Sequence, residues 1–261
     1  MTSEQLAALH EYSACDISDA LLKLKVPSAG FISDLHPYAP NAPHSPNLAT
    51  QPKVIGPAFP VLFAAKDAPA PAPQASTPTP HTTKQTPSSS SWPSPSPSLP
   101  PANIPPGTHY VDLTPAGHIP VLAQPPGQKC AVLGGIMAAR MRACGARGVV
   151  VGGRIRDLGE LRSLDFPVFA HSTSTVGTAA EAVPHAINVE IEIGGTLIHP
   201  GDTIFCDALE GTVVIPAAHL AAVLAILPEI VAADEHVLAD VKAGVCGVKE
   251  AFGKYRGKGK L

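Results

Sequence analysis

Hydrophobic and polar positions follow two different periods along this chain, and the change of period separates expected helices from expected strands. Helical spacing occurs in residues 3–12 and in a second segment that starts near Ser13 or Asp16 and ends before Pro27. A long apolar segment, residues 217–242, is also helical in pattern, with an internal proline that either kinks it or starts a second helix. Helices are therefore expected at both ends of the chain.

Strands are expected where short apolar runs lie between turn residues. The expected strands are residues 54–63, 119–123, 149–151, 167–170, 183–193, 196–198, 203–206 and 212–215. Pro57 and Pro60 interrupt the first strand, which favours an edge or bulged position because proline cannot donate a ladder hydrogen bond. Residues 36–52 are rich in proline and asparagine and are expected to form a loop. Strands that alternate with helices, followed by a hairpin-rich half, predict an α/β domain.

The composition changes abruptly between Asp67 and Pro106, where proline, serine, threonine and alanine dominate. Such a segment cannot bury enough apolar surface to offset its ordering entropy, so we expect it to be disordered or extended. A docking peptide for SH3- or WW-type domains is the alternative. We therefore predict one α/β domain, residues 1–64 and 109–261, with a Pro/Ser/Thr-rich disordered insertion at residues 65–108.

Charge and cysteine usage narrow the class of protein. A formal net charge of −3 gives no electrostatic case for a nucleic acid or a membrane as a partner. The cysteines are scattered and lack metal-ligand spacing, which favours reduced thiols. The sequence shows neither a secretory leader nor a spanning apolar run, so a cytoplasmic protein is expected. The basic end, with Lys254 and Arg256, is expected to be solvated, and its final Gly-Lys-Leu weakly resembles a peroxisomal address.

Residues 124–161 concentrate the candidate chemistry. Gly134 and Gly135 precede a helix whose first N–H groups lack partners, and such a helix start attracts a carboxylate or a phosphate. Beyond the next strand stand Arg156 and Asp157. Arginine binds a carboxylate bidentately, and aspartate can hold a hard cation such as Mg²⁺. From these residues alone, an ordinary helix start beside a surface ion pair explains the pattern about as well.

The chain resembles the RraA-like family, which includes hydroxymethyl-oxoglutarate (HMG/CHA) aldolases, oxaloacetate decarboxylases and regulators of RNase E activity. The matching segments are CDISDALLKL (15–24), KVIGPAF (53–59), GGIMAARMRACGARGVVVGGRIRD (134–157), FPVFAHSTS (166–174), IGGTLIHPGDTIFCDALEGTVVIP (193–216) and EAFGKY (250–255). The resemblance implies an α/β fold of the swivelling β/β/α type and a homotrimer or a dimer of trimers. It suggests a fungal-type member with a proline-rich insertion.

The resemblance also implies roles for the matching residues. The backbone amides that would bind the oxygens of a pyruvate-like 2-oxo acid belong to Gly134, Gly135, Ile136 and Met137. Arg156 would bind the same acid, and Asp157 would ligate Mg²⁺ or Mn²⁺. A cation chelated by a 2-oxo acid stabilises the pyruvate enolate that forms on C–C cleavage. The implied function is a metal-dependent lyase, either a 4-hydroxy-4-methyl-2-oxoglutarate aldolase, an oxaloacetate decarboxylase, or both.

One position departs from the family pattern. Aldolases of the family carry an acidic residue where this chain has Gly135, and its absence affects the aldol reaction more than decarboxylation. A further acid would come from a neighbouring subunit, and Asp234 and Glu235 are the candidates, although a solvated helix face explains them equally well. The alternative function is a non-catalytic, protein-binding regulator.

Overall fold

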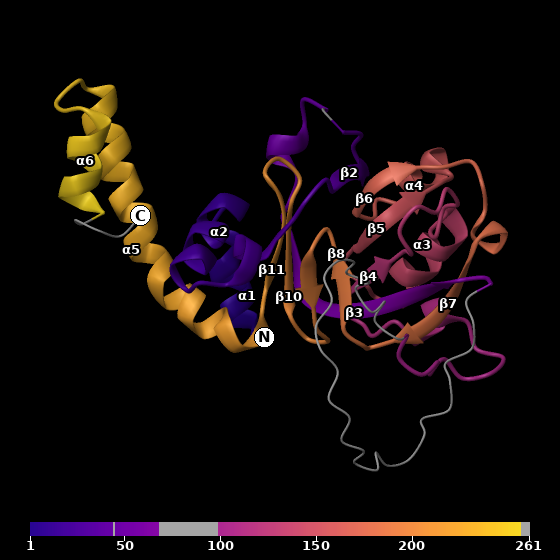
Figure 1. The fold of residues 1–261 in the computed structure, drawn as a ribbon. Coiled ribbons are helices and arrows are strands. Elements are labelled where there is room, and N and C mark those ends of the chain that lie inside the picture. The colour runs from indigo at the N-terminus through magenta and orange to yellow at the C-terminus, as the bar shows by residue number, and fades with distance from the viewer. Residues whose placement is uncertain (44, 68–98, 257–261) are drawn as a thin grey trace, which may run out of the picture.

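The computed structural model describes residues 1–43, 45–67 and 99–256, and it forms a mixed sheet with helices packed on it (Figure 1). The disorder expected for residues 68–98 and the C-terminal Gly-Lys-Leu, residues 259–261, lie outside the described residues. The division of the chain into a domain and an insertion stays a prediction.

The order of elements confirms the expected α/β class. The helices are α1 (Ser3–His10), α2 (Ala14–Lys23), α3 (Gly135–Ala143), α4 (Leu158–Ser163), α5 (Leu220–Lys242) and α6 (Val248–Tyr255). The strands are β1 (Phe31–Ile32), β2 (His36–Ala39), β3 (Val54–Ala65), β4 (Ile119–Ala123), β5 (Val149–Ile155), β6 (Val168–Thr173), β7 (Ala182–Ile187), β8 (Ile191–Ile193), β9 (Thr196–Ile198), β10 (Thr203–Asp207) and β11 (Gly211–Ile215). Two of the short 3₁₀ helices, η3 (Tyr110–Leu113) and η4 (Thr178–Ala180), contribute residues to the candidate site.

Strand β3 joins the two halves of the sheet, whose order in the described residues is β1-β11-β10-β3-β4-β5-β6-β2, with β7 also on β3. The expected edge position for β3 is therefore wrong. Pro57 forms the last antiparallel pair with β10, opposite Thr203, and the parallel pairing with β4 begins at Ala58. The missing N–H of Pro57 thus falls where β3 changes partner, which explains how a central strand accepts a proline.

The parallel strands β4, β5 and β6 determine where a site can form. Their connections are α3 and α4, which pack on a buried cluster that includes Leu122, Met141, Val151 and Leu161. Loops at the carboxyl ends of parallel strands lie together at one edge of a sheet, where ligands usually bind. Residues 124–134 follow β4 and residues 156–157 follow β5, so the candidate chemistry lies at this edge.

Two other expectations from the sequence need correction. Residues 36–39, expected in a loop, form β2, which pairs with β6. The alternating run at residues 183–193, expected as one strand, is divided into β7 and β8. The break lies at Asn188, which has a left-handed φ of 55°, a conformation that asparagine tolerates better than most residues. Its N–H donates to the carbonyl of Pro60 at 2.8 Å, so tertiary contact with β3 overrides the local alternation.

Residues 99–106, expected to be disordered, are held along β7. The Asn103 side chain donates to the Ile187 carbonyl and accepts from the Ile187 N–H, each at 2.8 Å. The Pro100 carbonyl lies 2.7 Å from Nε2 of His185. Composition alone did not indicate these contacts, because one asparagine side chain makes the two backbone hydrogen bonds that a neighbouring strand would otherwise make.

Helix α5 continues through Pro228 and runs away from the sheet past α1 and α2, with α6 folded back along its far end (Figure 1). The basic end is not simply solvated, because Lys254 Nζ lies 2.9 Å from Oδ2 of Asp240 and Arg256 pairs with Asp234. Residues Ala217–Lys242 are long and apolar enough to cross a membrane, so the expectation that the sequence holds no such apolar run is wrong. Length and composition alone are weak evidence, so the absence of a membrane partner stays a prediction.

Candidate active site

The segment before α3 lies directly beside the end of β5. Leu133 forms a parallel bridge with Ile155, and the N–H of Arg156 donates to the Leu133 carbonyl at 3.0 Å. These backbone contacts place the start of α3 next to Asp157, although 22 residues separate Gly135 from it in the sequence. The tertiary structure therefore brings the glycine pair and the Arg-Asp pair together.

Asp157 holds its carboxylate towards α3. Its backbone is left-handed, with φ 61° and ψ 44°, and although it occupies the N-cap position of α4 its side chain makes no capping bond. Instead Oδ2 lies 3.3 Å from the N–H nitrogen of Gly135 and 3.3 Å from Nε of Arg156. Asp157 is thus a non-glycine residue in a left-handed conformation, and its carboxylate does not cap the helix that it starts. Both features indicate that the carboxylate has a function.

The glycine pair is required by space, not by backbone conformation. Gly134 is extended, with φ −136°, which any residue can adopt. A Cβ at Gly134 would lie 2.5 Å from Oδ2 of Asp157 and 3.3 Å from Nε of Arg156. A Cβ at Gly135 would overlap the carboxylate of Glu160. The two glycines therefore make room for three charged side chains.

These residues border a cavity of about 540 Å³. Among the residues named from the sequence, Gly134, Ile136, Met137, Arg156 and Asp157 line it, whereas Gly135 is buried and does not line it. The remaining lining residues are Phe63, His109, Tyr110, Val132, Gly177, Thr178, Ala179, Ala182, Val183 and Pro184. The sequence did not indicate these residues, because they lie on separate segments and carry no motif.

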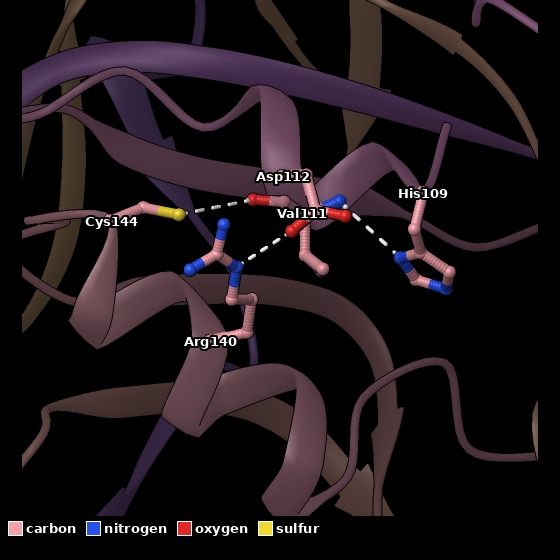
Figure 2. Close-up of polar contacts among 5 residues, drawn as sticks. All are labelled: His109, Val111, Asp112, Arg140 and Cys144. Atoms are coloured by element: carbon pink, nitrogen blue, oxygen red, sulfur yellow. Dashed lines mark hydrogen bonds and ion pairs between the residues drawn. The ribbon is translucent and has the colours of Figure 1, made fainter. Parts of the chain in front are cut away.

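One wall of the cavity, which the sequence analysis did not predict, is η3. Two side chains, one on α3 and one directly after it, hold η3 in place (Figure 2). Arg140 Nε donates to Oδ1 of Asp112 at 2.6 Å, and Cys144 Sγ donates to the Val111 carbonyl at 3.7 Å. Nδ1 of His109 accepts from the Val111 N–H at 3.4 Å, so the imidazole is fixed at the cavity edge (Figure 2). Helix α3, whose first residues border the cavity, thus also positions η3.

Tyr110 gives this wall an apolar base. Burial raises the pKa of the Tyr110 hydroxyl, so the group stays protonated. Its ring packs edge-on against Phe63, with ring centroids 5.5 Å apart. Another wall of the cavity is the loop before β7, where Thr178 Oγ1 donates to the Ala131 carbonyl at 2.7 Å. A Cβ at Gly177 would lie 2.9 Å from Nη1 of Arg156, so the guanidinium lies against this loop.

The donor groups fit a hard cation. Residues 1–43, 45–67 and 99–256 contain no group of three or more His, Cys, Asp or Glu side chains that could hold a metal. The glycine pair is instead flanked by two carboxylates, Asp157 and Glu160. Mg²⁺ typically takes one or two protein carboxylates and keeps several waters, so an oxygen-only pair suits it, whereas zinc prefers nitrogen and sulfur.

Other charged residues named from the sequence lie elsewhere. The Asp234 carboxylate accepts a hydrogen bond from Nε of Arg256 at 2.6 Å, whereas Glu235 is exposed. Both lie on α5, on the other side of the sheet from α3 (Figure 1). Neither reaches the cavity of its own chain, and a role in a neighbouring subunit stays a prediction. A buried carboxylate outside the candidate site, that of Asp202, is structural, because it accepts the N–H groups of His199 and Ala217, each at 2.8 Å.

Residues 14–214 match the RraA-like family described as Aldolase/RraA, and the chain belongs to this family. A Halalkalibacterium halodurans protein named as a candidate 4-hydroxy-4-methyl-2-oxoglutarate aldolase is 37% identical over 86 residues, which are 33% of this chain and 40% of that protein. A similarly named Arabidopsis thaliana protein is 31% identical over 80 residues, covering 31% of this chain and 48% of that one. The matches thus span less than half of these relatives.

Solved structures show the same fold. An uncharacterised protein from Pseudomonas syringae aligns with a TM-score of 0.67 and 20% identity, over 96% of this chain and 98% of the other. RraAS2 of Streptomyces coelicolor, an unusual member of the RNase ES inhibitor RraA family, aligns with a TM-score of 0.62 and 20% identity, over 93% and 97%. At this identity the similarity establishes the RraA-like fold, and the activity has to be argued from the site.

Proposed function

We propose that this protein is a divalent-metal-dependent lyase that cleaves a C–C bond of a 2-oxo acid through a pyruvate enolate. The reaction would be oxaloacetate decarboxylation, cleavage of 4-hydroxy-4-methyl-2-oxoglutarate, or both. The observation that carries this proposal is the convergence of the α3 start, Arg156 and Asp157 on one cavity. The names of the curated relatives support the same class of reaction.

In this proposal each group has a distinct task. The free N–H groups at the start of α3 and the Arg156 guanidinium bind the substrate carboxylate, since both favour a planar anion. Asp157 holds Mg²⁺ or Mn²⁺ beside them. When bound, the cation would polarise the keto group and stabilise negative charge that develops on its oxygen. The Phe63 and Tyr110 rings reduce water access at the base of the cavity, which strengthens these electrostatic interactions.

Decarboxylation is the better supported of the two reactions. It needs no base to remove a hydroxyl proton, whereas aldol cleavage does. Position 135 supplies no acid side chain. The tyrosine in the cavity is protonated, because burial raises the pKa of Tyr110. We expect oxaloacetate turnover to exceed aldol cleavage when both substrates are compared at equal concentration.

Replacement of Asp157 by asparagine tests the proposal. Asparagine also tolerates the left-handed backbone, so Asp157→Asn should fold while losing the charge that holds the cation. Pyruvate release from oxaloacetate, corrected for the metal-only reaction, should require Mg²⁺ or Mn²⁺ and stop with EDTA. The variant should lose on the order of a hundredfold or more in rate.

Asp165→Asn is the matched control, because Asp165 is likewise exposed and left-handed, with φ 47°, and does not line the cavity. It should keep full activity. Unchanged turnover in Asp157→Asn would rule out the proposed lyase site.

The non-catalytic alternative has its own signature. A protein-binding regulator would bind neither pyruvate nor oxalate in calorimetry, with or without Mn²⁺, and would release no pyruvate from oxaloacetate. We further propose a cytoplasmic homotrimer or dimer of trimers. Light scattering coupled to size exclusion should then give three or six times the mass of one chain, and a monomer would contradict the assembly without touching the lyase site.

A further inference from the structure

A second cavity lies near the carboxyl ends of the same parallel strands. Its volume is about 370 Å³, and none of the residues that line it also lines the cavity of the proposed lyase site. Its walls are the loop after β4, the glycine pair and Arg154 on β5, His171 and Ser172 on β6, and the β8–β9 hairpin. Because α/β folds commonly bind ligands at this edge of the sheet, the second cavity is a candidate for a separate ligand.

The guanidinium of Arg154 is held at this cavity without a counter-charge. Its Nη1 donates to Ser172 Oγ and to the Thr173 carbonyl, each at 3.0 Å. Arg154 is half-buried, and no ion pair among the described residues includes it. Nε and Nη2 stay free of bonds to the described part of the chain. Together they form a side of the guanidinium that binds a carboxylate with two parallel hydrogen bonds, so Arg154 is positioned for a planar anion.

Two other lining residues carry buried polar atoms that bond to nothing in the described residues. These atoms are Nε2 of His171 and Oε1 of Gln128. The amide nitrogen of Gln128 donates to the Glu181 carbonyl at 2.7 Å, which fixes Oε1 as the remaining acceptor. Buried polar atoms are nearly always hydrogen-bonded, so two exceptions on residues of one cavity wall indicate that a ligand bonds to them.

His171 presents an acceptor to such a ligand. Burial lowers the pKa of the His171 imidazole, so the ring is neutral at pH 7. A hydrogen bond with the backbone of Ser33 has a smaller and opposite effect, as a bond to a carbonyl has, so we assign the ring proton to Nδ1. Nε2 is then an acceptor. The exposed Glu192 of the hairpin adds a carboxylate, so the cavity combines one cationic donor with several acceptors.

We propose that this second cavity binds a small carboxylate that also carries hydroxyl or ammonium groups. The ligand carboxylate accepts from Nε and Nη2 of Arg154. Its hydroxyl or ammonium hydrogens are donated to His171, with Gln128 and Glu192 as further acceptors. A hydroxy acid and an amino acid share this chemistry. The site is separate from the lyase cavity and does not depend on the proposed function.

Calorimetry with three acids of equal chain length tests this site. Propionate, glycerate and serine all have three carbons and a carboxylate, but propionate carries neither hydroxyl nor ammonium groups. The full chain is titrated with each acid while saturating oxalate and Mn²⁺ fill the proposed lyase site. Glycerate or serine should bind on the order of tenfold more tightly than propionate, because each hydrogen bond to a buried partner contributes up to that factor. The same preference should hold in Asp157→Asn, so a failure of the lyase proposal leaves this result unaffected.

Variants of the lining residues assign the contacts. Arg154→Gln should weaken glycerate and serine binding by roughly tenfold or more, and Arg154→Lys should also weaken it, because lysine keeps the charge without the planar fork. His171→Phe keeps a ring of similar shape but removes Nε2, so it should reduce the preference over propionate. Arg142→Gln is the matched control, since Arg142 is exposed on α3 and does not line this cavity. Thermal melting checks that each variant is folded.

The outcomes also identify the ligand class. If serine binds more tightly than glycerate and Glu192→Gln weakens serine alone, the ligand is an amino acid, whereas tighter binding of glycerate identifies a hydroxy acid. The proposal is overturned if none of the three acids binds, if propionate binds as tightly as the other two, or if Arg154→Gln binds them as the unchanged chain does. Binding that is lost in Asp157→Asn but kept in Arg154→Gln would place the acid in the lyase cavity and would equally overturn it.

Discussion

The side chains of Asp157 and Glu160 occupy the space that Gly134 and Gly135 leave open beside the start of α3. The sequence singled out the glycine pair as a helix start with free N–H groups, and the structure adds a steric reason for each glycine. That reason could not be predicted locally, because the residues that would clash follow 22 or more positions later. Neighbouring residues along the chain did not reveal which side chains share this space.

Gly134→Ala should weaken Mn²⁺ binding on the order of tenfold or more, since the new methyl would push the Asp157 carboxylate out of place. The backbone at residue 134 is extended, so the substitution should not unfold the chain. Gly159→Ala is the matched control, because a Cβ at Gly159 meets nothing within 4 Å. Alanine there should stabilise α4 by roughly 0.5–1 kcal/mol and leave Mn²⁺ binding unchanged. Equal Mn²⁺ affinities for both variants would show that space at Gly134 does not matter.

The sequence predicted helices and strands well where the hydrophobic pattern was long. It predicted them poorly where contacts with a distant segment determine whether the element forms. Residues 217–242 were expected to be helical, and α5 spans most of them. The sequence did not predict α6, whose side chains pair with α5 instead of with the core. Asp240 on α5 accepts from Lys254 Nζ at 2.9 Å and from the Tyr255 hydroxyl at 2.8 Å. The hydrogen bond from Lys254 lowers the pKa of Asp240, so the carboxylate is ionised at neutral pH.

Asp240→Ala should therefore release α6 without melting the rest of the fold. Hydrogen exchange followed by mass spectrometry should show faster exchange of the amides in residues 248–255, while those of β4 and β5 keep their protection. Higher salt should produce a weaker form of the same change in the unaltered chain, because these exposed charges are screened. Glu229→Ala, an exposed position on the same helix with no hydrogen bond or ion pair to the described residues of α6, serves as the control. Unchanged exchange in α6 of the Asp240→Ala variant would mean that apolar packing alone holds it.

For the molecule as a whole, Glu181 joins three segments that are distant in sequence. Its carboxylate accepts from the N–H groups of Lys129 and Cys130 at 2.6 and 2.7 Å. Its carbonyl accepts from the Lys66 N–H at 2.8 Å and from Nε2 of Gln128 at 2.7 Å. The end of β3, the loop after β4 and the start of β7 thus meet at one residue, which directly precedes Ala182 and Val183 of the cavity lining.

This contact predicts a pH dependence of stability. The backbone hydrogen bonds, led by that from Cys130, lower the pKa of Glu181 below its ordinary value of 4.5. A carboxyl whose folded pKa is depressed adds stability above its unfolded pKa and loses it as the pH falls through the folded pKa. The urea midpoint of the unaltered chain should exceed that of Glu181→Gln at pH 7, and the gap should narrow as the pH falls below the ordinary value of 4.5. Glu229→Gln should show no such gap at either pH, and a gap for Glu181→Gln that persists in acid would exclude the charge as its cause.

The sequence by itself determined the α/β class, the helix start at the glycine pair and the identity of the Arg-Asp pair, because these depend on local spacing and on residue chemistry. Only the tertiary structure decided that β3 is central, that residues 99–106 lie along β7, and that Glu160 stands over Gly135. Each of these depends on which distant segments pack side by side. Local periodicity fixes which elements form, whereas long-range pairing fixes which side chains share a cavity.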